Sequence, residues 1–328
     1  MVKKIGEKIV ADLKRRSEKS LELAKQILQK EKIEDLTLCD ALKHYITNWS
    51  DFTHPGLFSL ACEAVGGNPD DVVSAQAAIA MMAAAFDIHD DIIDKSKVKH
   101  KIPTVYGKFG TETALLLGNA FLMEGFKLLV DSAKLLPKEK EKEALDTVKK
   151  LTFEVGNAHA IEVDLKKRKS IVRDDYLKVI KMKAAGIELD MHLGALFGGG
   201  KDVEVETLAR LGRILGILGT LREEFIDIFE IEELCQRITV QDLPLPLLIA
   251  MQDQKAKRKV LNITSRPKIT KSKINRLVDV VLEAEPVVKL KNEMQLLIED
   301  GKSLTNILPV AKLQSSLQLL LSFMLEDL

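Results

Sequence analysis

Two clusters of carboxylates share one spacing and are the residues best suited to chemistry. They are Asp90, Asp91 and Asp94, and, later in the chain, Glu223, Glu224 and Asp227. On a helix, the first and last members of each cluster lie on one face about one turn apart. Carboxylates this close repel one another unless a cation bridges them, and Mg²⁺ prefers such oxygen ligands together with water and substrate phosphates. Either cluster alone is also typical of a solvated helix face, but the matched spacing favours metal binding.

Each cluster follows an unusually apolar helical stretch. AQAAIAMMAAAF precedes the first cluster, and RLGRILGILGTL precedes the second. A helix that is apolar nearly all round belongs in the centre of a bundle. If the two helices face each other, metal ions on both sides of one diphosphate would neutralise this leaving group as its C–O bond breaks. The apolar stretches behind the carboxylates would then line a cavity for a hydrocarbon tail.

The rest of the chain also has a helical pattern. Apolar residues recur at spacings of three and four in nearly every long segment, while alternating strand patterns are nearly absent. The segments are 5–30, 70–95, 111–131, 138–168, 173–197, 203–233, 243–254, 271–284, 286–300 and 305–326. Asn68 or Asp70 is expected to cap the helix that carries the first cluster. We predict an all-α single domain over residues 1–328, a bundle of ten or more helices around a central cavity, with an N-terminal helix within residues 1–40.

Charge and cysteine usage exclude several function classes. The 49 basic and 49 acidic residues balance to a net charge of zero, which gives no long-range field for nucleic acid. The three cysteines form no CxxC pair, so neither a disulfide framework nor a zinc site is expected. The N-terminus lacks the apolar core of a secretory signal, and no uninterrupted apolar run of about 18 residues predicts a transmembrane helix. We expect a cytoplasmic protein.

Several segments resemble one known family. IHDDIIDKSKVKHKIPTVYGKFG is similar to the first aspartate-rich region of the trans-isoprenyl diphosphate synthases, the polyprenyl synthetase family, and LGILGTLREEFIDIFE is similar to the second. DDYLKVIKMKAAG resembles the stretch that carries a diphosphate-binding lysine, here Lys183. The resemblance covers residues 40–328 and implies the all-α isoprenoid synthase type I fold. It also implies a prenyltransferase of isoprenoid biosynthesis, an allylic prenyl diphosphate as substrate, up to three Mg²⁺ ions with the diphosphate, and usually a homodimer.

The resemblance also implies roles for individual residues. The catalytic residues would be Asp90, Asp91, Asp94 and Lys183, and both acidic clusters would bind metal. The diphosphate would contact Lys183, Lys99 and His100. The hydrocarbon tail would contact Met82, Ala85 and Phe86. These last three lie one to two helical turns before the first cluster, where bulk would limit the length of the tail, and core packing is the equal alternative.

The chain departs from the family in the half that would bind isopentenyl diphosphate. Asp51 lies in the segment Trp49–Pro55, where the family has the lysine and arginine that hold this diphosphate. Ala83 replaces a histidine, and Lys99 and His100 replace paired arginines. A carboxylate adds repulsion where a diphosphate needs attraction. Weak or absent binding of isopentenyl diphosphate is therefore expected.

Three interpretations of the function stay open at this point. The chain is an active prenyl chain elongator with a drifted acceptor site. Alternatively, it ionises an allylic diphosphate without isopentenyl diphosphate, as a class I terpene synthase does. In the third interpretation it is a non-catalytic regulatory subunit that forms a heteromer with an active synthase.

Three histidines and one basic run have two interpretations each. His89 would be a metal ligand or, with better odds, a packing residue. His54 would be a weakened phosphate contact or unrelated to substrate, and His159 would contact substrate or satisfy a neighbouring side chain. The basic run over residues 95–101 would be a solvated loop or a lid whose lysines reach the diphosphate.

Overall fold

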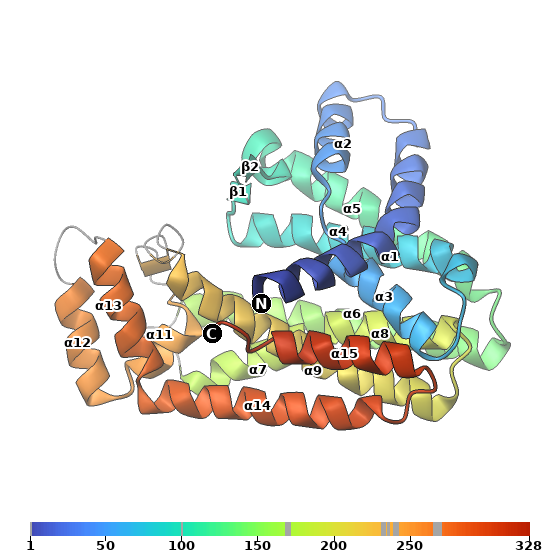
Figure 1. Cartoon of the computed structure of the whole chain (residues 1–328). Coiled ribbons are helices and arrows are strands. Elements are labelled where there is room, and N and C mark those ends of the chain that lie inside the picture. The colour runs from blue at the N-terminus through green and yellow to red at the C-terminus, as the bar shows by residue number, and fades with distance from the viewer. Residues whose placement is uncertain are drawn as a thin grey trace.

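The computed structural model describes residues 2–99, 101–167, 172–230, 234, 237–238, 243–264 and 271–328 (Figure 1). Its α-helices are, in chain order, α1 Val2–Lys30, α2 Leu36–Asn48, α3 Thr53–Ala64, α4 Val73–Ile93, α5 Val105–Ala133, α6 Lys138–Lys166, α7 Arg173–Lys183, α8 Ala185–Phe197, α9 Asp202–Phe229, α11 Leu245–Ala250, α12 Gln254–Thr264, α13 Lys271–Leu282, α14 Glu285–Thr305 and α15 Ala311–Phe323. A 3₁₀ turn, η1, spans Pro69–Val72, and two short strands, β1 and β2, span Val98–Lys99 and Ile102–Pro103. The predicted all-α class with ten or more helices is confirmed.

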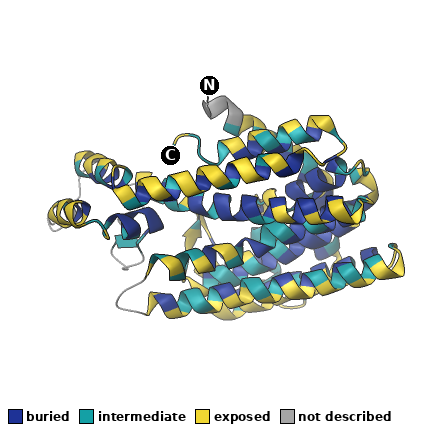
Figure 2. Cartoon of the chain, turned by 90° about the horizontal axis from the view of Figure 1, so that it is seen from below, coloured by how far each residue is buried: buried dark blue, intermediate teal, exposed yellow. Residues whose placement is uncertain are grey.

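Helices α4 and α9 lie in the interior of the bundle, as their apolar sequences predict. Helix α4 packs against α5 and α1, and α9 packs against α8, α14 and α7. Helix α3 joins the two halves, since it contacts α1, α4 and α8. Outer helices carry stripes of exposed residues beside stripes of buried ones (Figure 2). The two acidic clusters therefore lie near the carboxyl ends of two central helices.

The buried core has two main parts. One part lies among α3, α8, α9 and the later helices and includes Phe58 and Phe225. The other lies among α2, α4 and α5 and includes Trp49 and Phe121, whose ring centroids are 5.6 Å apart. Since α4 contributes buried residues to both parts, the helix that carries the first cluster is fixed on two sides.

Two glycines allow the central helices to approach one another closely. A Cβ on Gly216 of α9 would lie 2.8 Å from the Cα of Ala184, where α7 and α8 meet. A Cβ on Gly118 of α5 would lie 2.5 Å from the ring of His89 on α4. Real Cβ atoms do not tolerate such distances. The first contact matters for function, because Ala184 directly follows Lys183.

Local signals explain some element boundaries, and packing sets the others. The Asn68 side chain accepts a hydrogen bond from the N–H of Asp70 at 3.2 Å, so Asn68 is the predicted cap, although it caps η1. The predicted helix 173–197 is in fact two helices that meet at Ala184. The predicted helix 305–326 is also wrong at its start, because α14 ends at Thr305 and α15 begins only at Ala311.

Three helices, α2, α3 and α12, are absent from the predicted set, and one predicted end is misplaced. Helix α2 carries an aspartate cap at Asp35, and α3 is buried on nearly all sides, which removes the periodic pattern that predicts a helix. The segment predicted as helix 243–254 ends at Ala250, and a separate α12 begins at Gln254.

Two helical stretches are long and apolar enough to cross a membrane by length and composition alone, although neither contains an uninterrupted apolar run of about 18 residues. They are Pro69–Ile93 and Val105–Ala133. In the first, 67% of the apolar window is buried within the fold, as in the core helix of a soluble protein. In the second, 33% is buried, and exposed apolar side chains remain on α5.

Candidate active site

The end of α4 places Asp91 in the interior beside Lys99. Only 8% of the Asp91 side chain is exposed. The hairpin of β1 and β2 pairs Lys99 with Ile102, and the Lys99 Nζ lies 2.8 Å from Asp91 Oδ1 and 2.9 Å from Asp87 Oδ1. Burial raises the pKa of Asp91 to about 6, because the pairing with Lys99 does not offset desolvation and the charges of Asp87 and Asp90.

Helix α6 supplies basic side chains to the other two carboxylates of the first cluster. His159 Nδ1 lies 3.0 Å from Asp90 Oδ1, and Lys166 Nζ lies 2.8 Å from Asp94 Oδ1. Burial alone would raise the pKa of Asp90, but the contact with His159 and the charge of Lys183 lower it. Each carboxylate of the first cluster therefore faces a different basic side chain.

Lys183, at the end of α7, influences a carboxylate of each acidic cluster. Its ammonium group contacts the Glu162 carboxylate of α6. Its charge favours the ionised form of Asp90 on α4 and also that of Glu223 on α9. One ammonium group can act on both carboxylates only if the two clusters are near each other. The charge of Lys183 therefore acts on one carboxylate of each cluster, and a shared metal site between the two clusters stays a prediction.

The members of the second cluster lie in different surroundings. Glu223 is exposed, whereas the side chains of Glu224 and Asp227 are 13% and 27% exposed and pair with Arg237. Desolvation by the surrounding protein raises the pKa of Glu223, and the charges of Asp227 and Glu224 raise it further. Successive residues on a helix point about 100° apart, which explains why Glu223 and Glu224 do not share these surroundings.

The first cluster fits a magnesium site better than the second. Asp90 Oδ1 and Asp91 Oδ1 are buried and accept no hydrogen bond of regular geometry, so these hard oxygens retain capacity for Mg²⁺. Among the described residues, no group of three histidine, cysteine or acidic side chains is arranged to hold a metal ion, so diphosphate oxygens and water would have to complete its ligands. Glu224 and Asp227 do not fit, because a guanidinium already holds them. Glu223 is the candidate ligand from α9.

The residues expected to contact a hydrocarbon tail lie along α4 and are largely packed. Ala85 is fully buried, and Met82 is 4% exposed and packs against Gly125 of α5. Phe86 is half-buried. Their influence on chain length stays a prediction. His89 also packs against α5, which agrees with a packing residue and not with a metal ligand.

In the half where the sequence predicts a weak acceptor site, His54 pairs with a buried aspartate. His54 Nδ1 lies 2.6 Å from Asp190 Oδ2, and Asp190 is 2% exposed. Burial alone would lower the pKa of His54, but Asp190, together with Asp51 and Asp87, raises it to about 10. The imidazole is therefore charged at neutral pH, and carboxylates already compensate this charge. His100, another predicted substrate contact, lies outside the described residues.

Several residues at the site were not singled out from the sequence. They are Glu162, Lys166, Tyr176 and Arg237. The first two do have a signal, because His159, Glu162 and Lys166 follow one another at spacings of three and four on one face of α6. Tyr176 and Arg237 have none, since they reach Glu224 across 48 and 13 residues of chain.

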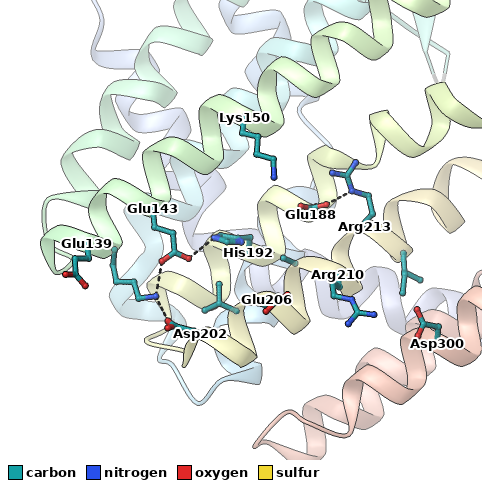
Figure 3. Close-up of a pocket in the computed structure, with 14 residues that line it drawn as sticks. Glu139, Glu143, Lys150, Glu188, His192, Asp202, Glu206, Arg210, Arg213 and Asp300 are labelled. Atoms are coloured by element: carbon teal, nitrogen blue, oxygen red, sulfur yellow. Dashed lines mark hydrogen bonds and ion pairs between the residues drawn. The ribbon is translucent and has the colours of Figure 1, made fainter.

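A separate charged groove lies among α6, α8, α9 and α14 (Figure 3). It has a volume of about 860 Å³, and none of the predicted site residues lines it. Its charges largely pair with one another: Lys140 contacts Glu143 and Asp202, and Arg213 contacts Glu188. Because these charges are compensated within the groove, the candidate site remains at the acidic clusters.

Comparisons with known proteins all indicate the same family. The profile of the polyprenyl synthetase family matches residues 36–281. A short chain isoprenyl diphosphate synthase of Methanothermobacter thermautotrophicus is 30% identical over 208 residues, which cover 62% of this chain and 63% of that protein. A geranylgeranyl diphosphate synthase of Methanosarcina mazei is 26% identical over 262 residues, which cover 77% of this chain and 78% of that protein.

The fold agrees with this relationship. The crystal structure of geranylgeranyl pyrophosphate synthetase from Pyrococcus horikoshii Ot3 superposes with a TM-score of 0.84 at 23% identity, over 98% of this chain and 99% of that chain. The family match includes both acidic clusters and Lys183. The match to the Methanothermobacter protein spans less than two thirds of that protein's length, at 63%. By sequence and fold, the chain belongs to the polyprenyl synthetase family, the trans-isoprenyl diphosphate synthases of isoprenoid biosynthesis.

Proposed function

We propose that the chain binds an allylic prenyl diphosphate between the two acidic clusters in the presence of Mg²⁺ and acts as a prenyltransferase. One observation carries the proposal: Asp90, Asp91 and Asp94 pair with basic side chains from α6 and β1, and the charges of Lys99 and Lys183 also act on Glu223 of α9. Mg²⁺ bound by these carboxylates and Glu223 would supply Lewis-acid stabilisation of the leaving diphosphate. The names of the relatives agree with this substrate class.

We expect three lysines to bind the diphosphate. Lys99, Lys166 and Lys183 come from β1, α6 and α7, and each contacts a carboxylate of the site. Each can turn its ammonium group from the carboxylate to a phosphate oxygen and form a charge-assisted hydrogen bond there. Positive charge held at this position stabilises the negative charge that develops on the leaving group. His159 remains beside Asp90 and orients this carboxylate.

The surroundings of His54 favour a second candidate function, in which isopentenyl diphosphate is not the acceptor. The His54 imidazolium is bonded to Asp190, and the charges of Asp51 and Asp87 also act on it. One cation among three carboxylates repels a diphosphate instead of attracting it. Under this candidate, the chain ionises the allylic diphosphate for another acceptor or for cyclisation, or it serves as a regulatory subunit of an active synthase.

The exposed apolar side chains of α5 support a homodimer as the assembled form. Leu115, Leu116, Met123 and Phe126 are 47%, 57%, 64% and 43% exposed. Their spacing places them along one side of the helix. A row of large apolar side chains in contact with water is unfavourable, and a second copy of this helix would cover it with a matching surface.

Incubation of the chain with farnesyl diphosphate, labelled isopentenyl diphosphate and Mg²⁺ tests the function. A prenyltransferase of the elongating type gives longer labelled prenyl diphosphates and releases diphosphate. Under the second candidate, an ionising enzyme gives diphosphate release without labelled product, and a regulatory subunit alone gives neither. A Lys183→Ala variant is the matched control and should lose at least tenfold of either activity, because it removes a cation that faces the leaving group. Diphosphate release that is equal in the wild type and the variant would contradict the proposed site.

A further inference from the structure

Arg237 holds two of the three carboxylates of the second acidic cluster. Its Nη1 contacts Asp227 Oδ2 and lies 3.2 Å from Glu224 Oε1, while its Nη2 lies 3.4 Å from Glu224 Oε2. The Arg237 side chain is 11% exposed. A guanidinium group offers several donors in a fixed plane and keeps its charge at any physiological pH. In this position it does for Glu224 and Asp227 what a bridging cation would do, because it separates and neutralises two neighbouring carboxylates.

Glu224 also has donors from two other parts of the fold. Its Oε1 accepts a hydrogen bond from the Tyr176 hydroxyl at 2.9 Å, and its Oε2 accepts one from the backbone N–H of Leu245 at 2.6 Å. Tyr176 belongs to α7, and Leu245 begins α11. Each oxygen of Glu224 therefore has two protein donors, so a metal ion could bind it only by displacing them. Displacement would separate a largely buried guanidinium from a carboxylate that it pairs with.

Glu223 has none of these contacts. It is exposed, and no ion pair or hydrogen bond of its side chain is found among the described residues. Lys183 and Lys99, which belong to the first half of the site, are close enough to favour its ionised form. The exposed Glu223 carboxylate is therefore available to a ligand, while its neighbour Glu224 is held by donors of the protein.

We propose that the second acidic cluster is divided into one ligand and one structural ion-pair network. Within this cluster, only Glu223 binds the metal ion that contacts the diphosphate. Glu224 and Asp227 form an ion-pair network with Arg237, and Glu224 links this network to Tyr176 of α7 and to the start of α11. Arg237 is thus a positioning residue that occupies the place a metal ion would otherwise take. This inference rests on the proposed function, since it assumes that the site binds metal and diphosphate.

Calorimetric titration of inorganic pyrophosphate in the presence of Mn²⁺ tests this division of labour. The variants are Glu223→Gln and Asp227→Asn, which are matched neutral substitutions within one cluster, and Asp90→Asn in the first cluster. Glu223→Gln and Asp90→Asn should each weaken binding at least tenfold, whereas Asp227→Asn should weaken it less than threefold. Thermal unfolding should show the reverse order: Asp227→Asn lowers the Tm by at least about 3 °C and Glu223→Gln does not.

A second variant keeps the inference testable if Asp227→Asn fails to fold. Arg237→Gln should lower the Tm, and Mn²⁺ without pyrophosphate should restore part of this loss, because the two carboxylates become available to the ion. Equal weakening of binding by Asp227→Asn and Glu223→Gln would overturn the inference, and so would an Arg237→Gln variant with an unchanged Tm. If Asp90→Asn binds Mn²⁺ and pyrophosphate as well as the wild type, the proposed function itself is wrong, which is a separate result.

Discussion

The ion pair of His54 and Asp190 makes a quantitative prediction about stability. His54→Gln removes the positive partner of a carboxylate that is only 2% exposed. Breaking a buried pair in this way costs roughly 3–5 kcal/mol, because the remaining charge is left without a partner. The His54 side chain is 31% exposed, so solvent screening reduces the expected loss to about 2–4 kcal/mol. The double variant His54→Gln/Asp190→Asn should recover at least about 1 kcal/mol of this loss, since no unpaired charge remains.

The same pair predicts how stability changes with pH. The pKa of His54 is raised from 6.5 to about 10 in the folded chain, so its stabilisation is fully present below pH 6.5 and is lost as the pH rises toward 10. At 1.36 kcal/mol for each unit of pKa, the raised pKa of His54 corresponds to a stabilisation of roughly 5 kcal/mol. Screening by solvent at the partly exposed ring lowers this stabilisation to about 2–4 kcal/mol. Burial of Asp190 acts in the opposite direction, because it also raises the pKa of this carboxyl.

Urea unfolding at pH values from 6 to 10, with EDTA present, measures both effects. The wild type should lose stability steadily above pH 6.5, and the double variant should lose much less. His44→Gln is the matched control, because His44 contacts the Pro103 carbonyl and has no carboxylate partner among the described residues. Parallel pH profiles for the wild type and the double variant would refute the reasoning, and so would a His54→Gln variant as stable as the wild type at pH 7.

Three further predictions follow from the packing and the charges. Gly216→Ala should cost about 1–3 kcal/mol in urea unfolding, because its Cβ meets the α7–α8 junction, whereas Gly219→Ala, with nothing within 4 Å, should be neutral or stabilising by up to about 1 kcal/mol. The pKa of Asp91 is raised from 3.8 to about 6, so the folded chain loses stability as the pH rises between these values. Asp91→Asn should abolish this dependence of stability on pH. Measured in EDTA at pH 7, the variant should be more stable than the wild type by about 1–3 kcal/mol. Phe126→Glu should shift the chain from dimer to monomer in light scattering, and the control Leu135→Glu, on an 85% exposed side chain that follows α5, should not.

The sequence predicts the parts of the site that lie on single helices. The apolar run of α4 is buried in the centre of the bundle. Asp90, Asp91 and Asp94 follow this run, so they fall at the end of a central helix. Lys183 is identified by resemblance to the family, and its charge acts on Asp90 in one cluster and on Glu223 in the other. The matching spacing of the second cluster is a weaker guide, because spacing alone does not show that Glu223 and Glu224 lie in different surroundings.

Contacts between distant segments are the part that sequence reasoning misses. His54 and Asp190 are 136 residues apart, and neither has a pattern that points to the other. Arg237 contacts Glu224 and Asp227 across 13 and 10 residues of chain, and no periodicity in the sequence indicates these contacts. The break at Ala184 is also invisible in the pattern, since both halves of the segment keep their helical spacing.

Binding of an allylic diphosphate through the first acidic cluster is the central claim, and calorimetry with farnesyl diphosphate tests it most directly. The titration is made with the wild type and with Asp90→Asn, each in Mg²⁺ and in EDTA. The wild type should bind in Mg²⁺ and bind at least tenfold more weakly in EDTA, a difference of at least about 1.4 kcal/mol, and Asp90→Asn should lose most of the Mg²⁺ dependence. An affinity that is indifferent both to Mg²⁺ and to the loss of the Asp90 carboxylate would contradict the claim.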